Sequence, residues 1–261
     1  MQIKNKISRL QNLFSTQENI LNIYTIAGFP KLNDTVEIVK ELAASGVDMV
    51  EIGMPFSDPL ADGPTIQEGS EIAIKNGITL DLILNQVKEI RKTVSIPIML
   101  MGYINQLIKY DIATFLEKAA NAGVDGFILP DLPLDIYQEN YKTLFEKYNL
   151  KMSFLITPQT SDSRIKIIAK ESTAFLYVVS SFAITGSKSN LEETQLDYFK
   201  KIKSMNLMTP KLIGFGISNK ATFQTACNFA DGAIIGSAFI KKIQASNDFK
   251  TTVSNFVKTL R

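Results

Sequence analysis

The sequence predicts a (β/α)8 TIM barrel with an extra N-terminal helix, built from all 261 residues as one α/β domain. Three observations lead to this prediction. Short apolar segments of strand length alternate with segments of helical periodicity along the chain. Eight such pairs need about the length of a single-domain α/β barrel. No linker or low-complexity segment interrupts the alternation.

Eight segments are predicted to be buried parallel strands, because they are mostly apolar and helices cover both faces of such a sheet. They span 19–27, 47–52, 96–101, 124–129, 152–156, 174–179, 211–213 and 231–235. An open doubly wound sheet is the alternative. That fold favours a G-x-G-x-x-G turn after its first strand, whereas the first strand here ends in Gly28-Phe29-Pro30.

The helices follow from apolar spacing and from residues that begin and end helices. A leading helix is predicted within residues 2–14, from Ile3, Ile7 and Leu10. Asp34 is predicted to cap a helix that runs to about Ser45. The remaining helices are predicted at 65–75, 80–93, 104–122, 134–148, 162–170, 191–205 and 218–228, with closing helices after 238.

Composition excludes several classes of function. The net charge is +2 and no basic stripe stands out, so neither nucleic acid nor a membrane surface is expected as a partner. No apolar run reaches the ~18 residues of a membrane span, and the first residues lack the core of a signal peptide. The single Cys227 fits a reducing cytoplasm.

The absence of histidine excludes a Ser-His-Asp nucleophile, a His-ligated zinc and a His base. Carboxylates, lysine or tyrosine must therefore carry any acid/base chemistry. A Schiff-base lysine is not expected, because Lys151 and Lys211 stand at strand starts. Magnesium is not expected either, because the acids that could bind it are scattered.

Residues 47–64 carry acids where a purely structural segment would avoid them. Glu51 lies inside an apolar strand, and Asp58 and Asp62 follow on a loop that Pro59, Gly63 and Pro64 stiffen. A buried carboxylate is costly unless its proton is used or its charge is paired. The segment therefore predicts a general acid/base pair; a core glutamate in a structural ion pair is the alternative for Glu51.

Ligands of this fold bind where strands end and the following loops begin. Aromatic and aliphatic side chains near those ends predict a pocket for a flat apolar group, although each is also an ordinary core residue. They are Tyr24, Met101, Tyr103, Ile128, Leu155, Tyr177 and Phe215. Glycines after the last two strands predict a phosphate site made of backbone N–H groups. These residues are Gly214, Gly216 and Gly236, with Ser237 beside them.

The segment E-I-G-M-P-F-S-D-P-L-A-D-G-P closely resembles the signature of the tryptophan synthase alpha chain family. Shorter matches extend across the chain: A-G-F-P, P-D-L-P, I-T-G, G-F-G-I-S and G-S-A. The resemblance implies cleavage of indole-3-glycerol phosphate to indole and glyceraldehyde 3-phosphate. It also implies a beta chain partner in an alpha2-beta2 heterotetramer, which carries pyridoxal phosphate, whereas this chain carries no cofactor.

The resemblance also implies roles for individual residues. Glu51 would protonate the indole ring and take the side-chain hydroxyl proton, Asp62 would accept the indole N–H, and Tyr177 would position Glu51. Thr185 would join the indole pocket, and Gly186 would join the phosphate site. Loops 53–64 and 180–190 would close over the substrate. Ser181 and Ala183 stand where the family often has arginine and glycine, which puts coupling to the partner in question.

Two other functions remain open at this point. One is a different barrel enzyme acting on a sugar phosphate, such as an isomerase, which a panel of substrates would distinguish. The other is a non-catalytic subunit that only activates a partner. The presence of both Glu51 and Asp62 argues against the second.

Overall fold

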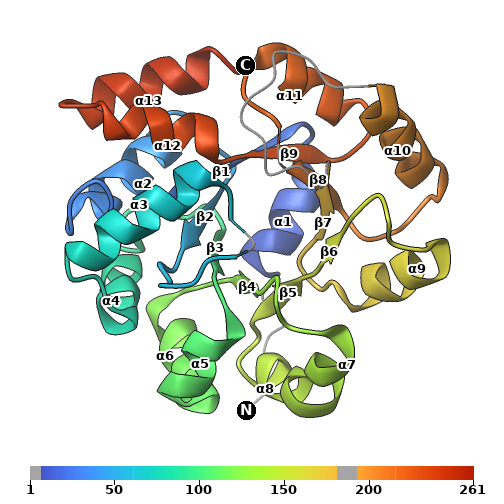
Figure 1. Ribbon diagram of the computed structural model, residues 1–261, viewed down its shortest axis with the longest axis horizontal. Helices are drawn as coiled ribbons and strands as arrows, with labels where there is room; N and C mark the ends of the chain where they lie inside the picture. Colours follow the sequence, from blue (N-terminus) through green and yellow to red (C-terminus); the bar gives the residue numbers. More distant parts are fainter. Residues whose placement is uncertain (1–6, 61, 181–192, 215) are drawn as a thin grey trace.

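The computed structural model describes residues 7–60, 62–180, 193–214 and 216–261, and it has the predicted barrel (Figure 1). Parallel strands form a ring with helices around it. The strands are β1 (Ile20–Ile26), β2 (Met49–Gly53), β3 (Ile98–Met101), β4 (Gly126–Ile128), β5 (Lys151–Ser153), β6 (Leu155–Ile156), β7 (Leu176–Val179), β8 (Lys211–Gly214) and β9 (Gly232–Ile235). Nearly all their residues are buried, as predicted for strands covered on both faces.

The ring closes through one stretch of chain that pairs with two neighbours. The sheet order is β5-β4-β3-β2-β1-β9-β8-β7-β6, so its two ends are consecutive segments. The sequence predicted one strand over 152–156, but the structure divides it at Phe154. There the chain changes its partner from β4 to β7, and the Phe154 ring packs on Tyr137 outside the ring of strands, with centroids 5.1 Å apart.

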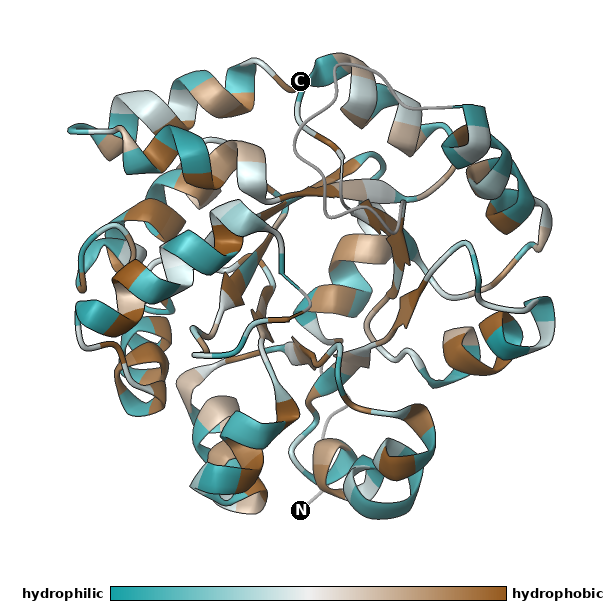
Figure 2. Ribbon diagram, viewed as in Figure 1, coloured by the Kyte–Doolittle hydropathy of each residue, from teal (hydrophilic) through white to brown (hydrophobic). Residues whose placement is uncertain are grey.

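Amphipathic helices cover the strands, with apolar faces inward and polar faces outward (Figure 2). They are α1 (Arg9–Thr16), α2 (Asp34–Ala44), α3 (Pro64–Lys75), α4 (Leu80–Ile90), α5 (Ile104–Tyr110), α6 (Ile112–Ala122), α7 (Leu134–Ile136), α8 (Lys142–Lys147), α9 (Asp162–Glu171), α10 (Glu193–Ser204), α11 (Lys220–Cys227), α12 (Ser237–Gln244) and α13 (Phe249–Lys258), with the π-helix η1 (Tyr137–Tyr141) between α7 and α8. In the part of the chain that the structure describes, no helix is long and apolar enough to cross a membrane.

Three predicted helices differ in detail from the structure. Asp34 is the first residue of α2 rather than its cap: Asn33 holds that position, and the Asp34 carboxylate accepts the N–H of Lys31 instead. The predicted helix to residue 122 breaks at Asp111, which has a φ of 76° and caps α6 with its side chain. The predicted helix to residue 148 contains the π-helix η1.

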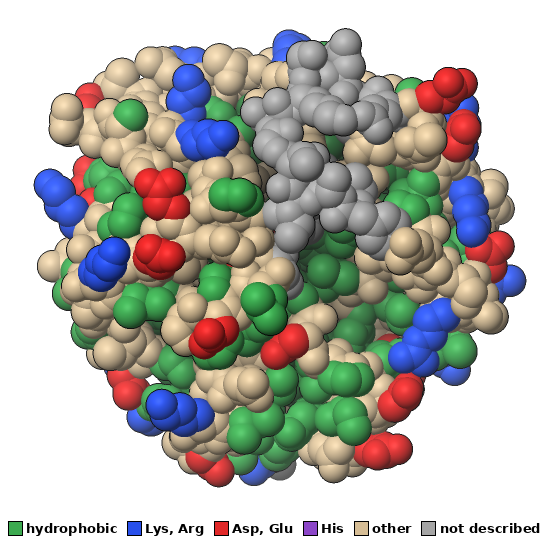
Figure 3. Space-filling view, viewed as in Figure 1, with side chains coloured by type: hydrophobic (Ala, Val, Ile, Leu, Met, Phe, Trp, Pro, Cys, Tyr) green, Lys and Arg blue, Asp and Glu red, His purple; other side chains and the backbone are tan. Residues whose placement is uncertain are grey.

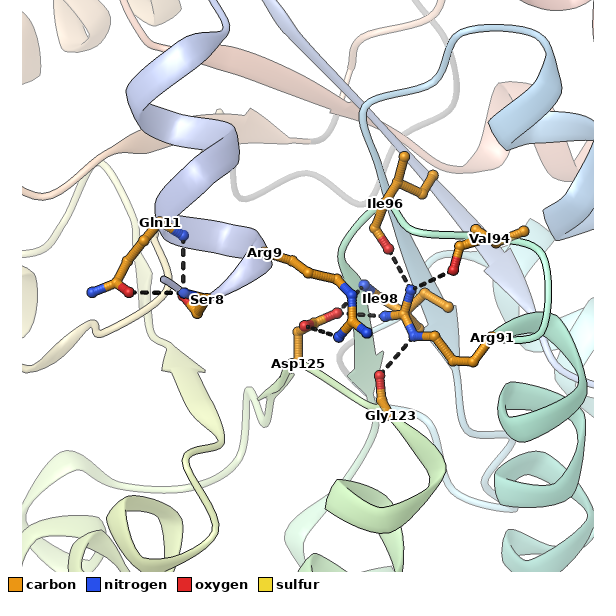
Figure 4. A network of polar contacts seen from close by, with 9 residues as sticks. All are labelled: Ser8, Arg9, Gln11, Arg91, Val94, Ile96, Ile98, Gly123 and Asp125. Carbon is orange, nitrogen blue, oxygen red and sulfur yellow. Dashed lines mark hydrogen bonds and ion pairs between the residues drawn. The ribbon is translucent and has the colours of Figure 1, made fainter. Parts of the chain in front are cut away.

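The N-terminal helix α1 closes the end of the barrel at which the strands begin. Among the described residues it begins at Arg9, behind a capping box between Ser8 and Gln11, and it buries Leu10 and Leu13, while residues 2–6 of the predicted helix lie outside the described residues. Arg9 pairs with Asp125, which also pairs with the buried Arg91 (Figure 4). The Arg91 guanidinium donates further hydrogen bonds to backbone carbonyls at 94, 96 and 123. This network ties α1 to β4 and to the end of α4.

Candidate active site

The strand register places the predicted residues on the inner face of the barrel. Tyr24 on β1 is opposite Glu51 on β2, and Glu51 is opposite Met99 on β3. Side chains alternate along a strand, so Gly53 and Met101 share this face. The same alternation carries through Ile128 on β4, Leu155 on β6 and Tyr177 on β7. These side chains therefore all point into the interior of the barrel.

Glu51 lies fully buried in the middle of β2, with none of its surface exposed. The side-chain amide of Asn22 on β1 donates a hydrogen bond from Nδ2 to Oε1 of Glu51 at 2.6 Å. Burial raises the pKa of Glu51 to about 8, and the Asn22 hydrogen bond acts in the opposite direction. No Lys or Arg of the described residues forms an ion pair with Glu51. Glu51 is therefore a protonated acid at neutral pH rather than half of an ion pair.

The loop after β2 is held at both ends by glutamine side chains. Nε2 of Gln106 on α5 donates to the carbonyl of Pro55 at 2.8 Å. Nε2 of Gln67 on α3 donates to the carbonyl of Asp62 at 2.9 Å. These contacts fix the path of the backbone between the strand and α3, and they place Asp62 at the mouth of the barrel.

Asp62 lies beside Tyr103, the residue that precedes α5. The Tyr103 hydroxyl donates to Oδ2 of Asp62 at 3.3 Å, and the Tyr103 ring packs against Phe56 with centroids 5.0 Å apart. Burial raises the pKa of Asp62 to about 6, and the hydrogen bond from Tyr103 lowers it. Asp62 is therefore mostly ionised at neutral pH, whereas Glu51 is not. Environments that push two carboxyl pKa values apart assign one as acid and the other as acceptor.

A small pocket opens beside Asp62 and Tyr103, and Glu51 is not among the residues that line it. It is lined by Tyr24, Met54, Asp62, Ser70, Met101, Gly102, Tyr103 and Pro130. Three of the predicted apolar residues, Tyr24, Met101 and Tyr103, thus line one pocket together with Asp62. Ile128, Leu155 and Tyr177 share the inner barrel face but are not among the residues that line this pocket.

Tyr24 and Tyr177 lie against glycines that leave room for their rings. A Cβ on Gly53 would lie 2.1 Å from the Tyr24 hydroxyl, and a Cβ on Gly214 would lie 2.4 Å from the Tyr177 hydroxyl. Burial and the nearby Asp62 and Glu51 raise the pKa of both tyrosines well above the usual range. Both phenols therefore stay protonated, and both can donate hydrogen bonds on the inner face of the barrel.

Comparison with known proteins agrees with this geometry. The family model described as "Tryptophan synthase alpha chain" matches residues 10–260. The chain belongs to the tryptophan synthase alpha chain family. It is 51% identical over 254 residues to the tryptophan synthase alpha chain of Flavobacterium psychrophilum, covering 97% of this chain and 100% of that protein. It is 46% identical to that of Parabacteroides distasonis, covering 98% and 100%.

Solved structures of the family have the same fold. The alpha subunit from Legionella pneumophila gives a TM-score of 0.87 at 29% identity, covering 98% of this chain and 97% of that one. The alpha subunit from Pyrococcus furiosus gives a TM-score of 0.86 at 32% identity, covering 94% and 98%. Tryptophan synthase from M. tuberculosis gives 0.85 at 25% identity, covering 97% and 100%. The predicted role of a lyase subunit in tryptophan biosynthesis is therefore confirmed.

The residues of this chain that were predicted to bind phosphate lie around the ends of two strands. Gly214 ends β8, Gly216 has a φ of 75°, and Gly236 follows β9 beside Tyr24. Ser237 opens α12, whose first turn has no side-chain cap. By contrast, Asn219 caps α11 with its own side chain, so α12 offers the more accessible helix N-terminus. Thr185, Gly186 and Phe215 lie outside the described residues, as do Ser181, Ala183 and most of loop 180–190.

Two other acids of the strand-end loops, Asp131 and Asp58, form local hydrogen bonds with neighbouring residues. Both oxygens of Asp131 accept the N–H of Ile104, which holds the start of α5. Asp58 is exposed and accepts a hydrogen bond from the neighbouring Ser57 hydroxyl at 2.6 Å. Among the described residues, no three acidic or cysteine side chains gather as metal ligands would. The family of alpha chains has no cofactor of its own.

Four polar residues of the site were missed by sequence reasoning. Asn22 stands among apolar neighbours in a strand, the same signal that identified Glu51. Gln67 and Gln106 gave no such signal, because a helical glutamine is ordinarily a solvated residue. Ser70 of α3 is buried and lines the pocket. Its position on a helix likewise gave no reason to select it.

Proposed function

We propose that the chain cleaves indole-3-glycerol phosphate by acid/base catalysis, with Glu51 and Asp62 as catalytic residues. One observation carries this proposal: two carboxyl groups of one site have pKa values of about 8 and about 6. At neutral pH, the site thus contains one proton donor and one anionic acceptor. This pair matches the two ends of an indole ring that must gain a proton on carbon and delocalise charge to nitrogen.

The reaction follows from these two protonation states. Glu51 gives its proton to the ring carbon that carries the side chain, and Asp62 accepts a hydrogen bond from the ring N–H as positive charge develops there. The bond between ring and side chain then breaks, and its electron pair returns to the ring. The adjacent hydroxyl becomes the aldehyde of glyceraldehyde 3-phosphate, and its proton passes back to the Glu51 carboxylate. The step is a retro-aldol cleavage that leaves Glu51 as it began.

The remaining residues bind and orient the substrate. The indole ring lies between Tyr24, Met101 and Tyr103, and Tyr177 holds Glu51 from the opposite wall. Ile128 and Leu155 extend the apolar lining, together with Thr185 and Phe215. The phosphate is bound by backbone N–H groups of Gly186, Gly214, Gly216 and Gly236 and by Ser237. The N-terminus of α12 supports this assignment, because a helix N-terminus without a side-chain cap favours an anion.

A beta chain that carries pyridoxal phosphate receives the indole in an alpha2-beta2 heterotetramer. The solved relatives include a tryptophan synthase from M. tuberculosis, whose name implies such a partner. Figure 3 shows hydrophobic side chains gathered on the barrel face that carries the pocket. Leu60 lies on the loop after β2 that carries Asp58 and Asp62, here called the acidic loop, and its side chain is 86% exposed. An exposed apolar side chain beside a site is a typical contact for a partner chain.

The proposal extends to the whole chain. Residues 1–261 form one domain, because α1 closes one end of the barrel while α13 packs on α2. The location is the cytoplasm, which the single Cys227 supports. Fractionation of cells that express the tagged chain tests the location.

The test of the reaction is indole release from indole-3-glycerol phosphate, for wild type and Glu51→Gln, each with and without a beta chain. Glu51→Gln is expected to lose roughly 10²–10⁴-fold in kcat. Equal rates would show that another group moves the proton. No activity in either protein, even with the partner, would refute the reaction. A panel of other sugar phosphates tests the isomerase alternative.

The partner is tested with two exposed residues at opposite ends of the barrel. Leu60→Asp is expected to weaken beta chain binding at least tenfold, measured by calorimetry or by activation of indole release. Met208, 98% exposed in the turn before β8, is the matched control, and Met208→Asp is expected to bind normally. Equal binding by both variants would move the interface away from the acidic loop.

A further inference from the structure

The barrel interior holds an uncharged amide that the mechanism above does not use. Asn22 lies in the middle of β1, two residues before Tyr24, and none of its surface is exposed. Its strand neighbours Leu21 and Ile23 are fully buried apolar residues. Burying an amide without a hydrogen bond costs free energy, so its position calls for a partner. That partner is Glu51.

The contact uses one oxygen of the carboxyl group and leaves the other. Nδ2 of Asn22 lies 2.6 Å from Oε1 of Glu51. Oε2 of Glu51 and Oδ1 of Asn22 are both buried and have no hydrogen-bond partner among the described residues. The two oxygens of Glu51 are therefore not equivalent: one accepts a fixed donor from the neighbouring strand, and one does not.

We propose that Asn22 is a positioning residue that holds Oε1 of Glu51 and leaves Oε2 as the oxygen that exchanges the proton with the substrate. This inference rests on the proposed function. A carboxylate that must give a proton to carbon and take one from oxygen works best when its plane is fixed. The strand-to-strand hydrogen bond supplies this orientation from the rigid part of the barrel rather than from a loop.

The electrostatic surroundings support the same assignment. The titratable groups that interact electrostatically with Glu51 are Tyr24 on β1 and Tyr177 on β7, and Asp62 and Tyr103 act on Tyr24 in turn. None of these is a cation. Burial raises the pKa of Glu51, and the donor that opposes this rise is Asn22. Without Asn22, the ionised form of Glu51 would lose its hydrogen bond and the carboxyl would hold its proton to higher pH.

The inference is tested with isosteric variants and a matched control in the same strand. Asn22→Leu and Asn22→Asp keep the shape of the side chain but remove the amide donor. Thr25→Val is the control: Thr25 is also fully buried on β1, and its hydroxyl has no partner among the described residues. Its side chain lies on the other face of the strand, away from Glu51.

The first measurement is the pH profile of kcat/KM for cleavage of indole-3-glycerol phosphate in the complex with a beta chain. The alkaline limb, which reports loss of the Glu51 proton, is expected to move up by about one pH unit in both Asn22 variants. Both variants are also expected to lose at least roughly tenfold in kcat. Thr25→Val is expected to keep the wild-type limb. A purely structural role for Asn22 would lower the rate without moving the limb.

The second measurement does not need activity. The carboxyl of Glu51 is titrated by NMR of the full chain labelled with 13C-carboxyl glutamate, and Glu51→Gln assigns its resonance. Its midpoint is expected to rise in Asn22→Leu and to stay at the wild-type value in Thr25→Val. An unchanged midpoint in Asn22→Leu, or an equal rise in Thr25→Val, overturns the inference.

The two measurements separate this inference from the proposed function. If wild type fails to cleave the substrate, the proposed reaction is wrong, while the titration still decides whether Asn22 controls Glu51. If Asn22→Leu does not fold, Asn22→Asp gives the titration, because the new acid keeps the volume and shares a proton with Glu51. A midpoint that stays unchanged there also overturns the inference.

Discussion

The hydroxyl oxygen of Tyr24 lies only 2.1 Å from the position that a Cβ on Gly53 would take. Gly53 is the last residue of β2, two positions after Glu51, and Tyr24 lies opposite Glu51 in the register. The glycine therefore makes the space that the Tyr24 ring fills beside the two acids. Such a close approach permits no other residue at this position without movement of the ring.

Gly53→Ala is expected to displace Tyr24 and to lower kcat/KM for indole release by roughly 10²-fold. In a Tyr24→Phe background the loss should be smaller, because the closest atom is removed. It should not vanish, because the next ring carbon would still lie 2.7 Å from the new Cβ. A double-mutant cycle measures this coupling. Equal losses in both backgrounds would show that another residue moves.

The two carboxyl pKa values predict a bell-shaped pH dependence of kcat/KM. Asp62 must be ionised to accept the ring N–H, so activity should rise through pH about 6. Glu51 must be protonated to donate to carbon, so activity should fall through pH about 8. Asp62→Asn should remove the acid limb and keep the alkaline one. A profile that is flat between pH 5 and 9 would contradict both assignments.

The buried Glu51, which the proposed reaction needs, is also expected to lower the stability of the folded chain at alkaline pH. Its folded-state pKa of about 8 lies above the unfolded value of 4.5, so the folded chain binds the proton more tightly. Its contribution is favourable at low pH and is lost as pH rises from about 4.5 to about 8. Glu51→Gln should therefore increase the free energy of unfolding at pH 8, by roughly 2–4 kcal/mol, and change it little at pH 4.5. Urea unfolding at the two pH values measures the difference, and parallel values would contradict it.

In the ion-pair network of Arg9, Asp125 and Arg91, replacing the two arginines is expected to lower the stability of the chain by unequal amounts. The Arg91 and Asp125 side chains are 9% and 8% exposed, whereas Arg9 is 45% exposed. Arg91→Met leaves Asp125 and three carbonyls short of a buried partner, and should destabilise the chain by at least about 3 kcal/mol. Arg9→Met should cost about 1 kcal/mol or less. Chemical denaturation measures both, and equal losses would refute the difference in burial as the cause.

The barrel itself could be predicted because its strands are apolar on both faces, so each strand forms a recognisable run. Two features could not. The division of the fifth strand at Phe154 depends on pairing with strands far away in the sequence. The break at Asp111 lies on an exposed stretch, where apolar spacing carries no information about backbone angles.

The site was partly predictable for a related reason. Glu51 was identified from its sequence neighbours, because a charged group in a buried strand is costly. Asn22 carries a weaker form of the same signal, since an amide costs less to bury than an acid. The pKa values of Glu51 and Asp62 depend on burial by segments that fold around them, so no local pattern contains them. Gln67 and Gln106 contact loop carbonyls, which only the folded chain brings near.

The placement of Glu51 within β2, rather than on a loop, divides the molecule into a part that can change and a part that cannot. Its position is set by the backbone of β2 and of the two strands that pair with β2, β1 and β3, so a substitution that alters these strands also moves the acid. Laboratory evolution toward new aromatic substrates should therefore accumulate changes in the loops at the strand ends and leave the strand interiors untouched. A library confined to the inner strand positions should return mostly inactive clones, whatever substrate is selected.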